Sequence, residues 1–231
     1  MTEKERQQKL SNYNVAETFL SINGEGTRAG QLSFFIRFTG CNLKCAYCDT
    51  SWANIPGAAF TPMTQESLYM LVKESGSHNV TITGGEPLLQ ENIYSLLALL
   101  CRDPQLYVEV ETNGSLPLKP FWDIPNRPAF TMDYKLPCSE MERFMYPENL
   151  LLLGRRDTVK FVCGSRTDLY RAKAIMDEYG LTDNTNVYLS PVFGALRPAE
   201  MVEFMKEQRM NDVTLQLQLH KFIWTPESRG V

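Results

Sequence analysis

The stretch VTITGGEPLLQENIYSLLALLC, residues 80–101, decides the fold class that the sequence predicts. Val80–Thr83 is a short run rich in β-branched residues, as in a buried strand, whereas apolar residues from Ile93 to Leu100 recur at the spacing of one helix face. Another apolar run, Leu106–Val110, follows directly. A strand, a helix and a second strand in this order indicate a parallel βαβ unit.

Similar runs recur on both sides of this unit, and several are continuous rather than alternating, as in strands buried on both faces. The predicted strands are Ser33–Phe38, Val80–Thr83, Leu106–Val110, Ala129–Met132, Thr158–Val162, Asn186–Leu189 and Val213–Leu219. Helices are predicted between many of them. The predicted helix boundaries are Thr64 with Gly76, Asp168 with Gly180, and Pro198 as the start of the last helix.

The segment Gly114–Pro128 contains five prolines or glycines and no helical period, so one crossover is predicted to be a loop. About seven strands and four clear helices argue against a closed eightfold barrel. The predicted fold class is therefore α/β, an open, partial TIM-like parallel β/α barrel. We predict a single domain over residues 1–231, with a short polar extension at the N-terminal end.

Composition excludes several function classes. The chain has 231 residues, 43% of them hydrophobic, and a formal net charge of −4, which argues against a duplex-binding protein with a basic face. No run of about 18 apolar residues is present, so no membrane span is expected. The polar start does not resemble a secretory signal. Three clustered cysteines favour a reducing compartment, and we expect a cytoplasmic protein.

The loop after the first predicted core strand reads Cys41-Asn-Leu-Lys-Cys45-Ala-Tyr-Cys48. Structural zinc normally takes four ligands, and neither histidine, His78 or His220, is near in sequence. Three thiolates in C-x3-C-x2-C spacing favour an iron–sulfur cluster with one iron open to an outside ligand, because a [4Fe–4S] cube usually takes four. Two alternatives remain open here: structural zinc with a distant fourth ligand, and three thiols without a metal.

The triplet, followed by Asp49, together with Gly84-Gly85-Glu86-Pro87 after the next strand, resembles the radical S-adenosylmethionine enzymes. The resemblance implies that S-adenosylmethionine (SAM) chelates the open iron of a [4Fe–4S] cluster. It also implies that reductive cleavage of SAM gives a 5′-deoxyadenosyl radical, which abstracts hydrogen from the substrate.

More specific motifs resemble one family in this group, the 7-carboxy-7-deazaguanine synthases. They are Ser21-Ile22-Asn23-Gly24-Glu25-Gly26, Phe35-Ile36-Arg37-Phe38, Asp49-Thr50, Thr83-Gly84-Gly85-Glu86-Pro87, Glu111-Thr112-Asn113-Gly114 and Gln218-Leu219-His220-Lys221. The resemblance implies conversion of 6-carboxy-5,6,7,8-tetrahydropterin into 7-carboxy-7-deazaguanine with loss of ammonia, in the biosynthesis of 7-deazapurines such as queuosine.

The resemblance also implies residue roles. The cluster ligands are Cys41, Cys45 and Cys48, the substrate residues are Ile22, Asn23, Gly24, Arg37 and Thr83, and the magnesium ligand is Thr50. The implied SAM-binding residues are Tyr47, Cys48, Asp49, Gly85, Glu86, Glu111, Asn113, Asp133, Tyr134, Lys135, Ser190, Pro191, Val192 and Phe193. Asp133-Tyr134-Lys135 departs from the Ser-Pro-Lys that is frequent in this family.

Two of these residues have other interpretations. An arginine in an apolar strand needs a partner, so Arg37 is expected to meet either a ligand carboxylate or a structural one. The resemblance implies that the hydroxyl of Thr50 binds Mg²⁺, and that Thr50 and Arg37 are the catalytic residues. Without the resemblance, this hydroxyl is better explained as a cap on the next turn.

Two other functions remain open from sequence. One is a glycyl-radical enzyme activase, which shares the cysteine triplet but acts on a protein. The other is a zinc-stapled binding module. The resemblance further implies a flavodoxin or ferredoxin as reductant and a homodimer, and direct nucleic-acid binding is not expected.

Overall fold

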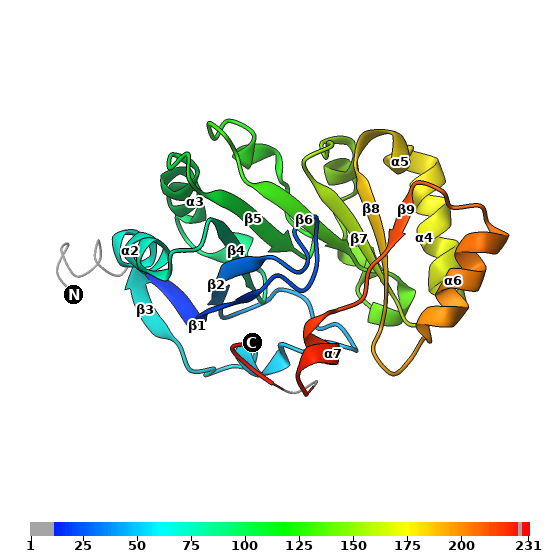
Figure 1. The fold of residues 1–231 in the computed structure, drawn as a ribbon, viewed down its shortest axis with the longest axis horizontal. Helices are drawn as coiled ribbons and strands as arrows, with labels where there is room; N and C mark the ends of the chain where they lie inside the picture. Colours follow the sequence, from blue (N-terminus) through cyan, green and yellow to red (C-terminus); the bar gives the residue numbers. More distant parts are fainter. Residues whose placement is uncertain (1–11, 226–227) are drawn as a thin grey trace.

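Nine strands form a single sheet, in the order β3-β1-β2-β4-β5-β6-β7-β8-β9, within residues 12–225 and 228–231, which this computed structural model describes (Figure 1). The strands are β1 (Asn12–Ile22), β2 (Leu32–Phe38), β3 (Thr61–Thr64), β4 (Asn79–Gly84), β5 (Tyr107–Thr112), β6 (Ala129–Tyr134), β7 (Thr158–Cys163), β8 (Asn186–Pro191) and β9 (Val213–Leu215). Strands β2 and β4 to β9 run parallel, whereas β1 is antiparallel to both of its neighbours.

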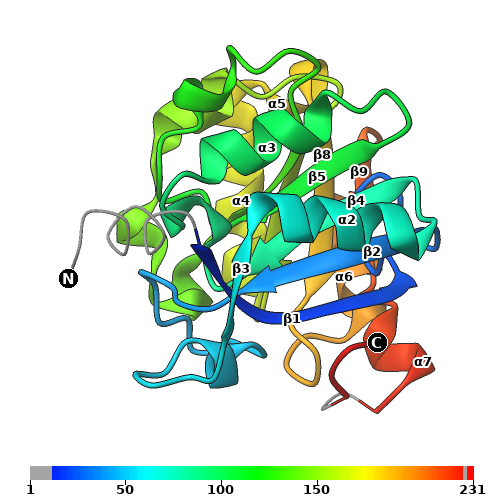
Figure 2. The ribbon, with the colours of Figure 1, turned by 90° about the vertical axis from the view of Figure 1, so that its left-hand side faces the viewer.

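The helices lie along the outside of the curved sheet. They are α2 (Gln65–Ser75), α3 (Ile93–Cys101), α4 (Arg166–Tyr179), α5 (Leu181–Asn184), α6 (Pro198–Glu207) and α7 (His220–Ile223). Helices α2 and α3 flank the first strands and α4 and α6 the last, whereas α7 lies apart, below the sheet in Figure 1 (Figures 1 and 2). None of the helices in the described ranges is both long and apolar enough to cross a bilayer.

The core lies between the sheet and the outer helices. Ile82 on β4, Phe130 on β6 and Phe161 on β7 are fully buried, as are Leu96 and Leu97 on α3. This arrangement confirms the predicted open α/β architecture, because no hydrogen-bonded pairing in the described chain closes the sheet between β3 and β9. The predicted N-terminal extension falls outside the described residues.

All seven predicted strands are present, and the differences lie at the two edges of the sheet. Strands β1 and β3 were not predicted, because β1 is only partly buried along most of its length and the short β3 contains Pro62. Proline is tolerated at such a sheet edge, since no ladder hydrogen bond is needed on its outer side. The last predicted strand ends early, at Leu215, and residues 216–219 turn toward the β1–β2 loop.

One helix start was wrongly predicted. Helix α4 is capped by Ser165, whose hydroxyl accepts a hydrogen bond from the backbone N–H of Asp168, while the Asp168 carboxylate accepts one from the backbone N–H of Ser165. This reciprocal capping box places the predicted cap residue three positions inside the helix. The other predicted boundaries, Thr64, Gly76, Gly180 and Pro198, are confirmed.

The turn before β7 depends on a buried carboxylate. Asp157 is fully buried and accepts hydrogen bonds from both terminal nitrogens of Arg127, at 2.8 and 2.7 Å. It also accepts the backbone N–H groups of Phe130 and Gly154, each at 3.0 Å. One carboxylate thus connects the starts of β6 and β7, the strands that carry two charged residues of the site described below.

We therefore expect Asp157→Ala to lower the free energy of unfolding by about 3–5 kcal/mol, because it leaves a buried guanidinium without its charge partner. Asp177→Ala is the matched control, since Asp177 forms an exposed i,i+4 pair with Lys173 and such pairs contribute about 0.3–0.5 kcal/mol. Urea denaturation followed by circular dichroism measures both. Equal destabilisation by the two substitutions would contradict this account.

Candidate functional site

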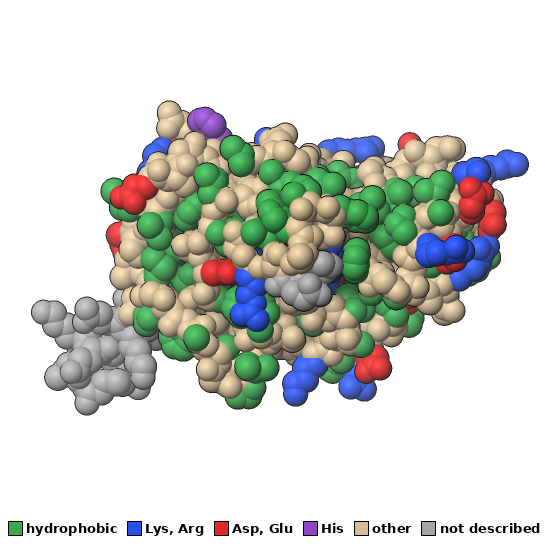
Figure 3. Space-filling view, turned by 60° about the horizontal axis from the view of Figure 1, so that its bottom comes forward, with side chains coloured by type: hydrophobic (Ala, Val, Ile, Leu, Met, Phe, Trp, Pro, Cys, Tyr) green, Lys and Arg blue, Asp and Glu red, His purple; other side chains and the backbone are tan. Residues whose placement is uncertain are grey.

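A cleft of about 730 Å³ lies where the parallel strands end. The β1–β2 loop, the loop after β2, the ends of β4 to β7 and the C-terminal segment all contribute to its walls. The C-terminal edges of parallel strands are where α/β folds place ligands. Figure 3 shows the face of the molecule below the sheet, where charged side chains gather at the α4 and α6 end.

The loop after β2, which carries the three cysteines, packs against the glycines at the end of β4. Gly85 N–H donates to Phe38 C=O at 3.2 Å, and Glu86 N–H donates to Gly40 C=O at 2.9 Å. A Cβ on Gly85 would lie 2.0 Å from the Gly40 oxygen, and one on Gly84 2.2 Å from the Phe38 oxygen. Gly84 also has φ of +140°, in the range that favours glycine. Both glycines are thus needed for backbone to pack directly on backbone.

Cys41, Cys45 and Cys48 all line the cleft, and none forms a disulfide. Burial raises the pKa of Cys41 and Cys45, and the proximity of the other thiols raises both pKa values further. The Cys41 sulfur accepts hydrogen bonds from Leu43 N–H at 3.4 Å and from Asn113 Nδ2 at 3.6 Å. Neighbouring thiols with N–H donors directed at sulfur fit ligands of an iron–sulfur cluster.

In the described part of the chain, no three His, Cys, Asp or Glu side chains are gathered as ligands of a single metal ion. A tetrahedral zinc site requires its sulfurs about 2.3 Å from one centre. Three thiolates on a [4Fe–4S] cube instead bind three different irons. The three thiols of the loop fit the three cysteine ligands of such a cluster.

Glu86 is held by hydrogen bonds within the protein. Its side chain is fully buried and accepts hydrogen bonds from Leu88 N–H, Thr112 Oγ1 and Asn113 N–H, at 3.1, 2.9 and 2.7 Å. Burial raises the pKa of this carboxyl to about 7. Glu86 does not line the cleft and holds the end of β5 against the cysteine loop. Its implied contact with SAM stays a prediction.

The β1–β2 loop is anchored from two sides. Asn23 Nδ2 donates to Glu109 Oε2 at 2.8 Å, so the side chain of Asn23 points into the protein and does not line the cleft. The Gln216 side chain makes two hydrogen bonds of 2.9 Å with the backbone of Gly26. These contacts present Ile22 and Gly24 to the cleft.

Arg37 has a structural carboxylate as partner. Its Nε donates to Glu17 Oε1 on β1 at 2.9 Å, and its guanidinium lies 5.7 Å from the ring centroid of Phe19. All three residues line the cleft. Of the two expectations for Arg37, the structural carboxylate is therefore observed, and Arg37 also lines the cleft.

Acidic and basic groups alternate at the ends of β5, β6 and β7. Glu111 accepts a hydrogen bond from Thr83 Oγ1 at 2.7 Å, and burial and the charge of Glu25 raise its pKa. Lys135 Nζ lies 2.8 Å from Asp133 Oδ2. Lys160, which sequence reasoning missed, forms an ion pair with Glu25. The signal for Lys160 was present, because a lysine within an apolar strand must find buried partners.

Besides Glu86, three predicted SAM-binding residues do not line the cleft. Tyr134 packs in the core, with its ring 5.6 Å from that of Phe161, because its neighbours Asp133 and Lys135 take the opposite face of the chain. Ser190 and Pro191 are buried in β8. The Ser190 hydroxyl has no hydrogen-bond partner in the described residues.

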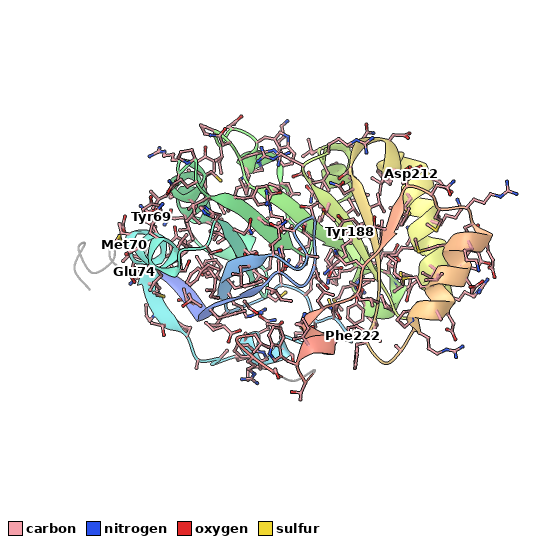
Figure 4. The ribbon with its side chains drawn as sticks, viewed as in Figure 1. Tyr69, Met70, Glu74, Tyr188, Asp212 and Phe222 are labelled. Carbon is pink, nitrogen blue, oxygen red and sulfur yellow. The ribbon has the colours of Figure 1, made fainter. Side chains whose placement is uncertain are left out.

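Residues of the C-terminal segment, among them His220, Lys221 and Arg229, line the cleft. Lys221 Nζ on α7 lies 3.1 Å from Asp49 Oδ2, and the Arg229 guanidinium lies 4.2 Å from the ring centroid of Trp52. Burial lowers the pKa of His220, also on α7. Phe222 is on the same helix, and Figure 4 shows it below the sheet. Sequence reasoning left this segment unplaced, because only the three-dimensional path brings it to the cysteine loop.

Most of the predicted site residues thus converge. Those that line the cleft are Ile22, Gly24, Arg37, Cys41, Cys45, Tyr47, Cys48, Asp49, Thr50, Thr83, Gly85, Glu111, Asn113, Asp133, Lys135, Val192 and Phe193. Those that do not line it are Asn23, Glu86, Tyr134, Ser190 and Pro191.

Comparisons with known proteins agree with this geometry. The family model of the radical SAM superfamily matches residues 35–132. The 7-carboxy-7-deazaguanine synthase of Clostridium acetobutylicum is 54% identical over 95% of this chain and 100% of its own length. The chain belongs to the 7-carboxy-7-deazaguanine synthase family. The enzyme of that name from Chlorobaculum tepidum is 37% identical, covering 94% of this chain and 97% of its own.

A solved structure, QueE from Escherichia coli, has the same fold with a TM-score of 0.71 and 20% identity, covering 94% of this chain and 98% of that one. As a member of this family, the chain is a radical SAM lyase of the queuosine and 7-deazapurine pathway. A [4Fe–4S] cluster and SAM follow from that membership. The activase and zinc-module alternatives receive no support from these relatives.

The buried carboxyl of Glu109 should make the free energy of unfolding depend on pH. Burial raises its pKa to about 7, whereas the unfolded carboxyl ionises near 4.5. Between these values the folded state holds a proton that the unfolded state has lost, so this residue makes stability fall as pH rises. Glu109→Gln should reduce the fall between pH 5 and 7.5 by on the order of 1–3 kcal/mol.

Urea denaturation at the two pH values measures this difference. Exposed Glu74 supplies the control Glu74→Gln, which should leave the pH dependence as in the unsubstituted protein. The assignment fails if Glu109→Gln and Glu74→Gln show the same slope with pH.

Proposed function

We propose that this chain converts 6-carboxy-5,6,7,8-tetrahydropterin into 7-carboxy-7-deazaguanine with release of ammonia. The observation that carries the proposal is the placement of three cysteines and Arg37 on the walls of one cleft. A metal-cluster site and a guanidinium suited to a carboxylate are thus brought to the same space. The names of the two relatives support the same reaction.

Cys41, Cys45 and Cys48 would hold the cluster, and Tyr47, Asp49, Gly85 and Lys135 would contact SAM. A reduced cluster with SAM bound to it would supply a 5′-deoxyadenosyl radical for hydrogen abstraction. Around it, the protein provides a cleft to whose walls the described residues of the C-terminal segment contribute. Such enclosure excludes water and stray hydrogen donors, which would quench a radical.

Ile22, Gly24, Arg37 and Thr83 would contact the substrate. The Arg37 guanidinium is held by Glu17 through Nε, which orients its terminal nitrogens. A planar guanidinium binds a carboxylate in two parallel hydrogen bonds, so it would fix the acidic group of the pterin. This orientation places the carbon that bears the carboxylate, from which hydrogen is removed.

Thr50 would bind Mg²⁺ together with the substrate carboxylate. Its hydroxyl donates to Asp49 Oδ1 at 3.1 Å and does not cap the following turn, Ser51–Ala53. The capping explanation for Thr50 is therefore wrong, and Thr50 lines the cleft. Mg²⁺ prefers oxygen ligands and commonly joins protein to an anionic substrate group.

A flavodoxin or ferredoxin would supply the electron, because the proposed reaction requires one from outside the chain. A homodimer in the cytoplasm completes the proposal; closed twofold assemblies are the commonest soluble oligomers.

Anaerobic reconstitution with iron and sulfide, followed by turnover of the pterin with SAM and dithionite, tests the function. The chain should form the deazapurine, and deuterium on the carbon that bears the carboxylate should appear in 5′-deoxyadenosine or product. Cys45→Ala should abolish both, whereas Cys101→Ala, at a cysteine buried in the core away from the cleft, should retain activity. Zinc at one per chain without sulfide would refute the proposal.

Thr50→Val tests the metal site. It keeps the shape of the side chain but removes the oxygen, so the Mg²⁺ concentration for half-maximal turnover should rise about tenfold or more, a loss comparable to that of one ligand contact. The measurement is turnover over a magnesium titration. Ser51→Ala, one residue on, should leave the titration unchanged, and an unaltered titration in Thr50→Val would argue against the site.

A further inference from the structure

Lys160 is a buried cation that joins two parts of the cleft. It lies on β7, is 7% exposed, and pairs with Glu25 Oε2 of the β1–β2 loop. Its Nζ is also 3.6 Å from Asp133 Oδ2, on the adjacent strand β6. An ammonium has three N–H donors, so one group can serve both carboxylates at once. None of the motifs in the sequence gave Lys160 a role.

The two carboxylates belong to different sides of the cleft. Glu25 directly follows Gly24, on the loop proposed to meet the substrate. Asp133 is paired with Lys135, on the side proposed to meet SAM. Both carboxylates and Lys160 line the cleft. A single ammonium therefore connects the substrate side with the SAM side.

Glu25 and Asp133 each have a second, buried oxygen that does not pair with Lys160. Glu25 Oε1 and Asp133 Oδ1 have no hydrogen-bond partner in the described chain, and the same is true of the Tyr47 hydroxyl, on the cysteine loop. A buried polar atom without a partner is costly, so such atoms in a cleft are explained by donors that a ligand brings. The lysine thus holds two carboxylates that each have a buried oxygen without a partner in the described chain.

Lys160 stays protonated in this setting. Burial lowers its pKa, but the carboxylates of Glu25, Asp133 and Glu111 raise it by more, so that the net pKa lies above the ordinary value. A permanently charged ammonium forms charge-assisted hydrogen bonds, which are stronger than neutral ones and hold together segments far apart in sequence.

We propose that Lys160 is a positioning residue that fixes Glu25 and Asp133 together, so that occupancy of the SAM side and the geometry of the substrate side depend on one ammonium. The inference rests on the proposed function for the substrate side only. The effect on SAM binding is measured without any pterin. The competing explanation is a purely structural role, in which Lys160 neutralises buried carboxylates and affects folding alone.

The experiment compares Lys160→Met with Lys160→Arg in the reconstituted holoenzyme. Met removes the charge at similar length, whereas Arg retains it. The Kd of SAM is measured by equilibrium dialysis, and the change in the electron paramagnetic resonance spectrum of the reduced cluster on addition of SAM is recorded. Lys173→Met, which removes a surface lysine on α4, is the matched control.

We expect Lys160→Met to raise the Kd of SAM about tenfold or more, as for loss of one partner of a buried charge pair. It should also raise KM for the pterin, and its cluster spectrum should respond less to SAM. Lys160→Arg should recover much of the affinity, and Lys173→Met should behave as the unsubstituted protein. Wild-type SAM affinity in Lys160→Met would overturn the proposal.

A double-substitution cycle separates positioning from folding. If Lys160 transmits the state of Glu25 to the SAM side, Glu25→Gln weakens SAM binding when Lys160 is present and has no further effect in Lys160→Met. Additive effects on SAM binding would show that the two sides are independent and would overturn the proposal. Should the pterin not be turned over by the unsubstituted chain, the proposed function fails, while this cycle still decides the role of Lys160.

Discussion

The site depends on a direct backbone contact between two loops. The chain after β2 rests on Gly84 and Gly85, where any side chain would collide with the carbonyl oxygens of Phe38 or Gly40. Because β2 and β4 are parallel neighbours, both loops leave the sheet at the same edge. This contact seats the three cysteines at the ends of the strands and brings the β5 end, through Glu86, against them.

Buried charge is the second organising feature. Buried carboxylates in and next to the cleft are costly in a medium of low dielectric constant, so each has a lysine, an amide or a hydroxyl as partner. Asn23 satisfies Glu109, Thr83 satisfies Glu111, and Lys160 satisfies Glu25. The same contacts orient the loops that line the cleft, and stability and function are therefore coupled in this region.

The differences between expectation and structure have local physical causes. Asn23 and Glu86 lie in motifs that suggested ligand contact, yet both side chains hold loops in place. Asn23 donates to the buried carboxylate of Glu109, and Glu86 accepts the backbone N–H of Asn113. Tyr134 follows Asp133 in a strand, where successive side chains point to opposite faces, so only one of the two faces the cleft. Spacing along the chain carried no information on these competing partners.

The sequence by itself determined the α/β class, the seven parallel strands and the cysteine triplet, because hydrophobic period and local spacing are properties of contiguous residues. Tertiary structure alone decided which side chains face the cleft, that Glu17 holds Arg37, and that Lys160 lies between Glu25 and Asp133. These contacts join residues up to 135 positions apart. Their existence depends on strand order and sheet curvature, which no local pattern specifies.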